Sequence, residues 1–275
     1  MSNITFTEKK LRYYEHVNNK LWRDESMDIC KSMLMVTTMV LSIVTSVQAA
    51  VNFSGKAFLD YGLTSLATDV NKFDIGRVYV KGDAELDKGT LFTFTTDLAR
   101  NSATSVGTDY YDVFFKFAYI EKSDLLPDVK VRLGLQPIPW CGTVEKAWGL
   151  RFVEKVLSDR KGLMKTADAG LGVVGKIGNE LSYHVVLSNG EGVSTESNQA
   201  KDLDILATYK ISEQAWLAGS YHASGTSTEE TRYGLTGAVV LSPLLLGGEV
   251  IMARDGSTDK QGLSAFGTLT ISDTL

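Results

Sequence analysis

Charged side chains recur at every second position in several stretches of the sequence. Arg77, Lys81 and Asp83 alternate with Val78 and Val80, a period of two that predicts a strand whose faces meet opposite environments. Charges of both signs on one face can order water and screen ions by size and charge, whereas a dry core cannot hold so many of them. The pattern therefore predicts a wet interior lined by Arg77, Lys81, Asp83, Glu85, Asp97, Asp112, Lys116, Lys130, Arg132, Asp168, Lys176, Asp202, Asp204, Arg232 and Glu249.

These charges also have a plainer interpretation. Opposite charges on neighbouring strands can pair and merely solvate a polar interior. For any single residue this interpretation is preferred, and the prediction of a wet interior rests on the whole set.

The stretch from Gly134 to Lys165 interrupts the alternation and carries nine charged residues. Pro137 and Pro139 cannot donate to a ladder, so the preceding strand must stop there. Apolar residues recurring every four positions predict a short helix within 144–157. The residues Arg151, Lys155, Arg160, Lys161 and Lys165 outnumber the acids Glu145, Glu154 and Asp159. Folded inward, the loop 137–166 would narrow a pore and favour anions locally; the alternative is a loop packed on the outer rim.

Motifs for enzymatic chemistry are missing from the sequence. It contains no Gly-x-Ser-x-Gly, no HExxH and no phosphate-binding loop. The histidines His16, His184 and His222 are scattered without metal spacing, and Cys141 would be the only cysteine left after export. The sequence therefore predicts neither an enzyme nor a cofactor nor a metal site.

The N-terminal part has the pattern of an export signal. The 275-residue chain has a net charge of −5, which gives no basic surplus for nucleic acid. Residues 32–47 are uncharged, follow Lys31 and precede small residues, as in a secretory signal peptide. We predict a signal peptide over 27–49 with cleavage between Ala49 and Ala50. Residues 1–26 are interpreted as a polar leader or a misassigned start.

The connections between predicted strands alternate in length. Long polar connections follow the first, third, fifth, seventh, ninth and eleventh strands, and short ones fall between, with 122–127 the longest of the short set. In a meander this puts every long loop at one rim, as in outer-membrane barrels. Tyr119, Tyr183, Tyr209 and Tyr233 are assigned to the lipid face. The predicted strands are 51–62, 73–86, 90–100, 110–121, 129–136, 167–177, 180–188, 202–211, 214–223, 231–241, 244–254 and 261–271.

The fold class that follows is all-β, an antiparallel up-and-down transmembrane β-barrel of at least 12 strands over 50–275. Closure is required because hydrocarbon offers no partner to the backbone groups of an open edge. Outer-membrane lipid would then contact the outer face. A soluble sandwich or lipocalin-like barrel is the alternative. The composition of 271–275 is that of another turn leading into a further strand, so the chain is expected to be truncated; a closed barrel of twelve strands is the alternative.

Three segments carry a family resemblance: GLQPIPW with the following EKAWGLR and SDRKGLMKTADAGLGV, FDIGRVYVKGDAEL, and HVVLSNGEG. Together they resemble bacterial outer-membrane porins, broadly the phosphate-selective and general diffusion porin group. The resemblance implies a homotrimer of barrels with about 16 to 18 strands each, located in the bacterial outer membrane. It also implies passive uptake of small solutes. No run of arginines and lysines suited to a phosphate ladder is evident.

The function predicted from the sequence is passive diffusion of small hydrophilic solutes or ions through a water-filled barrel. The third long connection would fold inward and narrow it. The alternatives are a non-conducting barrel acting as adhesin or structural anchor, and a barrel-embedded enzyme, which the absence of a clustered Ser/His/Asp set disfavours. The residues expected to line the pore or its constriction are Arg77, Lys81, Asp97, Asp112, Lys116, Lys130, Arg132, Glu145, Arg151, Lys155 and Arg160.

Overall fold

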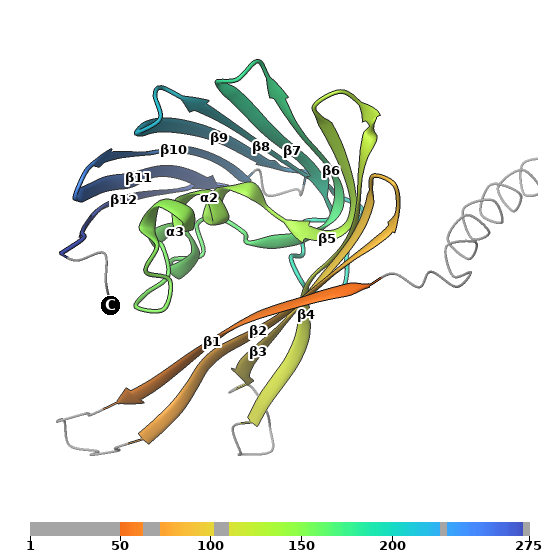
Figure 1. Cartoon of the computed structure of the whole chain (residues 1–275), viewed down its shortest axis with the longest axis horizontal. Helices are drawn as coiled ribbons and strands as arrows, with labels where there is room; N and C mark the ends of the chain where they lie inside the picture. Colours follow the sequence, from red (N-terminus) through yellow and green to blue (C-terminus); the bar gives the residue numbers. More distant parts are fainter. Residues whose placement is uncertain (1–49, 63–71, 102–109, 226–229, 272–275) are drawn as a thin grey trace, which may run out of the picture. The chain divides into compact units, whose positions relative to one another are not determined.

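The fold was analysed in a computed structural model of the chain (Figure 1). The structure describes residues 50–62, 72–101, 110–225 and 230–271. The predicted leader (1–26), the signal peptide (27–49) and the residue Ala49 on one side of the predicted cleavage site lie outside these residues. Ala50 on the other side is exposed.

Twelve antiparallel strands form one sheet in which each strand pairs with the next along the chain. This confirms the predicted all-β, up-and-down arrangement. Among the described strands, β1 and β12 each pair with a single neighbour, so the sheet is not closed. The strands are β1 (Val51–Gly62), β2 (Lys72–Asp87), β3 (Thr90–Asn101), β4 (Tyr110–Leu126), β5 (Val129–Pro137), β6 (Ala167–Ile177), β7 (Leu181–Ser188), β8 (Asp202–Lys210), β9 (Ala215–Ser224), β10 (Glu230–Leu241), β11 (Leu244–Asp255) and β12 (Thr258–Leu269).

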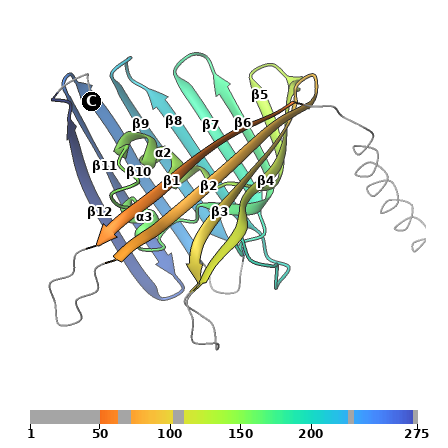
Figure 2. The same ribbon diagram turned by 60° about the horizontal axis from the view of Figure 1, so that its bottom comes forward.

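Connection lengths alternate as predicted, with two corrections. Short turns join β2 to β3, β6 to β7, β8 to β9 and β10 to β11 at one end of the sheet (Figure 2). The expected longer connection 122–127 is wrong, because β4 continues to Leu126 and Asp128 turns the chain with a φ of 56°. The expected long loop after the eleventh strand is also wrong. Gly256, with a φ of 58°, permits a two-residue turn, so β12 begins at Thr258 rather than 261.

The sheet is curved (Figure 1), and its two faces differ in chemistry. On the convex face, large apolar side chains are exposed, among them Val113, Leu171, Leu235 and Leu263. The charged residues of the alternating strands occupy the concave face, where pairing register aligns them across strands. One such row contains Arg132, Asp204, His222 and Arg232.

Tyr119 was assigned to the lipid face, and this assignment is wrong. The pairing of β3 with β4 shifts by one residue, so that Phe117 lies opposite Thr95 while Phe115 lies opposite Thr96. Lys116 is the extra residue of this β-bulge. Because a bulge exchanges the two faces of a strand, Tyr119 lies opposite Thr93 on the concave face. Strict alternation along the sequence could not reveal this exchange.

The β5–β6 connection holds two helices, α2 (Pro139–Trp148) and α3 (Leu157–Arg160). Both lie on the concave side of the sheet (Figure 1). The predicted helix within 144–157 is therefore misplaced. Proline at the first helical position starts α2 early, and Gly149, with a φ of 68°, ends it in the left-handed conformation. We refer to residues 138–166 as the inner loop.

Candidate functional site

The inner loop is packed against the concave face of β8 to β12. Its side chains Trp140 and Val144 form a buried cluster with Leu206 of β8 and with Ile251 and Ala253 of β11. Farther along α2, the Trp148 ring lies 5.4 Å from that of Phe266 on β12, with the ring planes 64° apart. The same cluster includes Cys141, Val156, Leu163, Met164 and Ala218. Burial of this apolar surface holds the loop on one side of the sheet.

A buried carboxylate ties both helices of the inner loop to β11. Glu249 is 1% exposed. Its Oε2 accepts a hydrogen bond from Trp140 Nε1 at 3.3 Å, and its Oε1 accepts one from the backbone N–H of Ser158 at 3.2 Å. Near the end of the loop, Lys165 Nζ lies 2.5 Å from Asp202 Oδ2 on β8. The polar contacts thus fix the loop at three points against the sheet.

The tip of the inner loop reaches the opposite part of the sheet. The Arg151 guanidinium carbon lies 5.8 Å from the ring centre of Phe58 on β1, and Arg151 Nε is 2.9 Å from Glu145 Oε1. Burial raises the pKa of Glu145, against the opposing effects of Arg151 and of Lys116 on β4. Arg151 and Glu145 therefore face the β1–β4 part of the sheet, while α2 and α3 pack against β8–β12.

The predicted positive surplus of the inner loop is largely offset by pairing. Lys155 Nζ lies 3.1 Å from Asp159 Oδ1, and Arg160 Nη1 lies 3.5 Å from Glu154 Oε2. Arg151 and Lys165 also have carboxylate partners. Among the described residues, Lys161 has none. Arg151, Lys155 and Arg160 thus lie on one loop, as expected, but none of them is a free cation.

Predicted pore-lining residues of β2 to β5 come together on the concave face. Arg77 pairs with Asp97, and Lys81 Nζ lies 2.6 Å from Asp83 Oδ2. Glu121 of β4 accepts hydrogen bonds from both Lys130 Nζ at 2.8 Å and Arg132 Nε at 2.7 Å. Asp112 lies on β4 toward the opposite end of that strand. We call this surface, together with Phe58 and Tyr79, the open wall.

Aromatic rings on the open wall were not among the predicted site residues. Lys116 Nζ lies 4.9 Å from the ring centre of Tyr79 and 5.8 Å from that of Phe117. The Arg132 guanidinium carbon lies 5.2 Å from the ring centre of Tyr119. Tyr79 could have been found, since it shares the alternating face of Arg77 and Lys81. Tyr119 and Phe117 could not, because the bulge at Lys116 moves them to this face.

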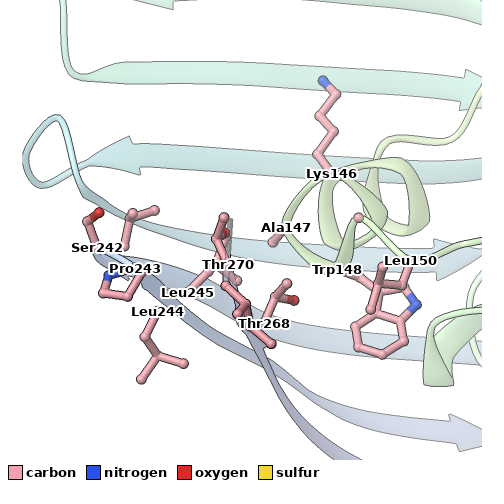
Figure 3. Close-up of a pocket in the computed structure, with 13 residues that line it drawn as sticks. Lys146, Ala147, Trp148, Leu150, Ser242, Pro243, Leu244, Leu245, Thr268 and Thr270 are labelled. Atoms are coloured by element: carbon pink, nitrogen blue, oxygen red, sulfur yellow. The ribbon is translucent and has the colours of Figure 1, made fainter. Parts of the chain in front are cut away.

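A cavity of about 650 Å³ lies between the end of α2 and the short-turn ends of β10, β11 and β12. Its lining includes Trp148, Leu245 and Thr268, and Thr268 Oγ1 is buried with no hydrogen-bond partner among the described residues. In Figure 3 the Lys146 side chain extends away from these residues. Lys146 is the one charged residue among the described residues of this lining, and the cation–aromatic pairs of the open wall lie elsewhere, so the cavity offers little charge to select a solute.

Cys141 has a packing role in this arrangement. It is buried, and its sulfur lies 3.8 Å from Ser158 Oγ and 3.7 Å from the carbonyl oxygen of Met164. Burial raises the pKa of the thiol, and the negative charge of Asp159 raises it further. A thiol with a raised pKa stays protonated and is therefore a poor nucleophile.

The described ranges lack two other features. No group of three or more His, Cys, Asp or Glu residues there is arranged to hold a metal ion. No helix in the same part of the chain is long and apolar enough to cross a membrane.

The chain is similar to solved porin structures at low sequence identity. A triple mutant of Rhodopseudomonas blastica porin is 9% identical, with a TM-score of 0.42, covering 82% of this chain and 91% of its own. A mutant of the same porin with five substitutions is 12% identical with the same TM-score and coverage. No protein-family model matches the chain, and a search of curated protein sequences finds no match. At these identities and TM-scores the likeness carries no argument about activity.

Proposed function

We propose that the protein is a porin-like channel through which small hydrophilic solutes or ions diffuse passively. The observation that carries the proposal is the position of the inner loop. It packs on β8–β12, and its Arg151 lies 5.8 Å from Phe58 on β1. A segment that contacts both parts of a curved sheet narrows the space between them. Residues 138–166 would therefore act as the constriction.

The two faces of the sheet support this proposal physically. Apolar side chains on the convex face suit contact with lipid hydrocarbon, and the paired charges of the concave face suit contact with water. We place the protein in the bacterial outer membrane, exported by the signal peptide 27–49 with cleavage between Ala49 and Ala50. The homotrimer implied by the sequence resemblance belongs to the same proposal. N-terminal sequencing of exported protein and its mass in detergent test these two points.

Planar-bilayer recordings of the exported, full-length protein test the channel itself. Unaltered protein should give discrete conductance steps in potassium chloride. Replacing the loop tip 150–155 by two glycines removes the segment that reaches Phe58 but keeps the buried cluster of α2, and single-channel conductance should rise.

A deletion of equal size provides the control. Residues 193–198 belong to the connection between β7 and β8 and are largely exposed, so their replacement by two glycines should leave conductance unchanged. Absence of conductance steps from correctly inserted, unaltered protein would end the channel proposal. Equal conductance in the two deletion variants would place the inner loop outside the conducting path.

A further inference from the structure

We infer that the open wall contains a subsite for small aromatic carboxylates, a solute class for which the channel would be selective. The inference rests on the proposed channel function and deepens it. Two features of the open wall carry it: cations that have no carboxylate of their own, and aromatic rings interleaved with those cations.

Cations without a carboxylate of their own lie at Lys116, whose charge also acts on Glu145 of the inner loop, and beside Glu121. Lys116 has no carboxylate within 4.0 Å among the described residues, and its Nζ lies 3.4 Å from the Tyr79 hydroxyl. Glu121, by contrast, is shared by Lys130 and Arg132, so one carboxylate faces two cations. Since a charge that is partly withdrawn from water favours a counter-ion, an anionic group of a solute would be stabilised beside Lys116.

Aromatic rings accompany these cations on the same wall. The rings of Phe58 and Tyr79 have centres 6.0 Å apart with planes at 81°, and Lys116 lies over the rings of Tyr79 and Phe117. Phe58, Tyr79 and Lys116 are each half-buried, so part of every group faces the open side. Aromatic rings pair favourably in edge-to-face or offset geometry and attract cations to their faces.

A solute with a carboxylate and an aromatic ring would satisfy both features at once. Its carboxylate would approach Lys116 and the Tyr79 hydroxyl, and its ring would lie against Phe58 or Tyr79. An inorganic anion can use only the first feature, and an aliphatic carboxylate of similar size lacks the ring interactions. The expected order of affinity is therefore benzoate, then cyclohexanecarboxylate, then chloride.

Block of potassium chloride current by added benzoate or cyclohexanecarboxylate tests this inference in reconstituted full-length channels. Benzoate should block at a concentration about fivefold lower than cyclohexanecarboxylate, as expected for roughly 1 kcal/mol of aromatic interaction at 1.4 kcal/mol per factor of ten. Lys116→Gln should weaken block by both organic anions. Tyr79→Leu should reduce the preference for benzoate because only Phe58 then remains to contact the ring, and Tyr79→Phe should keep most of it.

Lys176→Gln serves as the matched control. Lys176 lies on the concave-facing row of β6, is exposed, and has no aromatic contact among the described residues. This substitution should change neither block nor preference, although it removes the same charge. Potassium chloride conductance of each variant verifies that it has folded and inserted.

The possible failures are distinguishable. Conducting channels that benzoate and cyclohexanecarboxylate block equally would overturn the subsite and leave the channel function intact. The subsite is also overturned if Lys116→Gln and Lys176→Gln change block by the organic anions to the same extent. Inserted protein without any conductance would overturn both proposals.

Discussion

The two parts of the concave face differ in what covers them. On β8–β12 the inner loop covers the strands and excludes water around Trp140, Val144 and Ile251. On β1–β5 neither α2 nor α3 packs on the strands among the described residues. The side chains of Arg77 and Arg132 there are 25% and 18% exposed. We call the first region the covered wall, in contrast to the open wall.

The same alternating pattern therefore serves different purposes on the two walls. Glu249 on the covered wall is 1% exposed and holds the inner loop. Lys116 on the open wall contacts a hydroxyl and two rings and keeps access to solvent. Glu249 is thus structural because the loop buries it, whereas Lys116 stays available to a solute; Asp97 and Glu121 of the open wall are buried by their cation partners instead. Substitutions on the covered wall should mainly change stability, and those on the open wall should mainly change selectivity.

The largest effect is expected for Trp140→Ala on the covered wall. Trp140 is 2% exposed within the apolar cluster, and truncating a buried tryptophan typically costs about 3–5 kcal/mol. The free energy of unfolding, measured by urea titration in detergent or vesicles, should fall by this amount. Phe152→Ala is the control. Its side chain is 61% exposed on the same loop, so the change should stay within about 0.5 kcal/mol. Equal losses of unfolding free energy in the two variants would contradict the packing of Trp140 against β8–β12.

A smaller effect is expected for Glu249→Ala. The substitution leaves Trp140 Nε1 and the Ser158 N–H without their acceptor. An unsatisfied buried donor costs about 1–3 kcal/mol, but the freed loop can relax and admit water to both donors, so the net loss should stay below that of Trp140→Ala. Glu249→Gln keeps one acceptor and should lie between the alanine variant and the unaltered protein. Because the loop loses its ties, current through Glu249→Ala should also be noisier.

Glu85→Gln gives the matched comparison for the Glu249 variants. Glu85 faces the concave side of β2 near its short turn and is exposed. Its substitution should change neither unfolding nor current noise. Quiet current from Glu249→Ala, at unchanged stability, would show that the carboxylate does not hold the loop.

The sheet could be predicted from the sequence because strand period and turn length are local properties. The pattern placed all twelve strands, and most predicted ends agree with the structure within one or two residues. The errors arose where a single residue changes the geometry. Lys116 shifts the register of β4, and Gly256 converts an expected loop into a two-residue turn.

The site was less predictable than the sheet because it depends on contacts distant in sequence. Trp140 and Glu249 meet across 109 positions, and no local pattern distinguishes Glu249 from other alternating charges. Counting the loop charges correctly indicated a cationic segment but not its neutralisation by Glu145, Asp159 and Glu154. Composition states which charges are present, and only the folded loop decides which remain free.

The smallest expected effect concerns Glu145, which faces the boundary between the two walls. Its pKa is raised, chiefly by burial, so between its ordinary value and the raised value the folded state binds a proton that the unfolded state has released. Stability should therefore fall as pH rises through this window, and Glu145→Gln should remove that part of the pH dependence. Urea unfolding between about pH 4 and pH 7 measures it.

Glu196 provides a control of opposite sign. Its pKa is lowered, first of all by the hydrogen bond from the backbone N–H of Asn198, which lies 2.9 Å from Glu196 Oε1. Its contribution to the free energy of unfolding is present above the ordinary pKa and is lost as the pH falls through the lowered pKa. The free energy of unfolding should therefore no longer fall on acidification in Glu196→Gln. In Glu145→Gln it should no longer fall as the pH rises. If both variants change the profile in the same direction, Glu145 is not buried where the loop tip meets the open wall, and the boundary between the two walls must lie elsewhere.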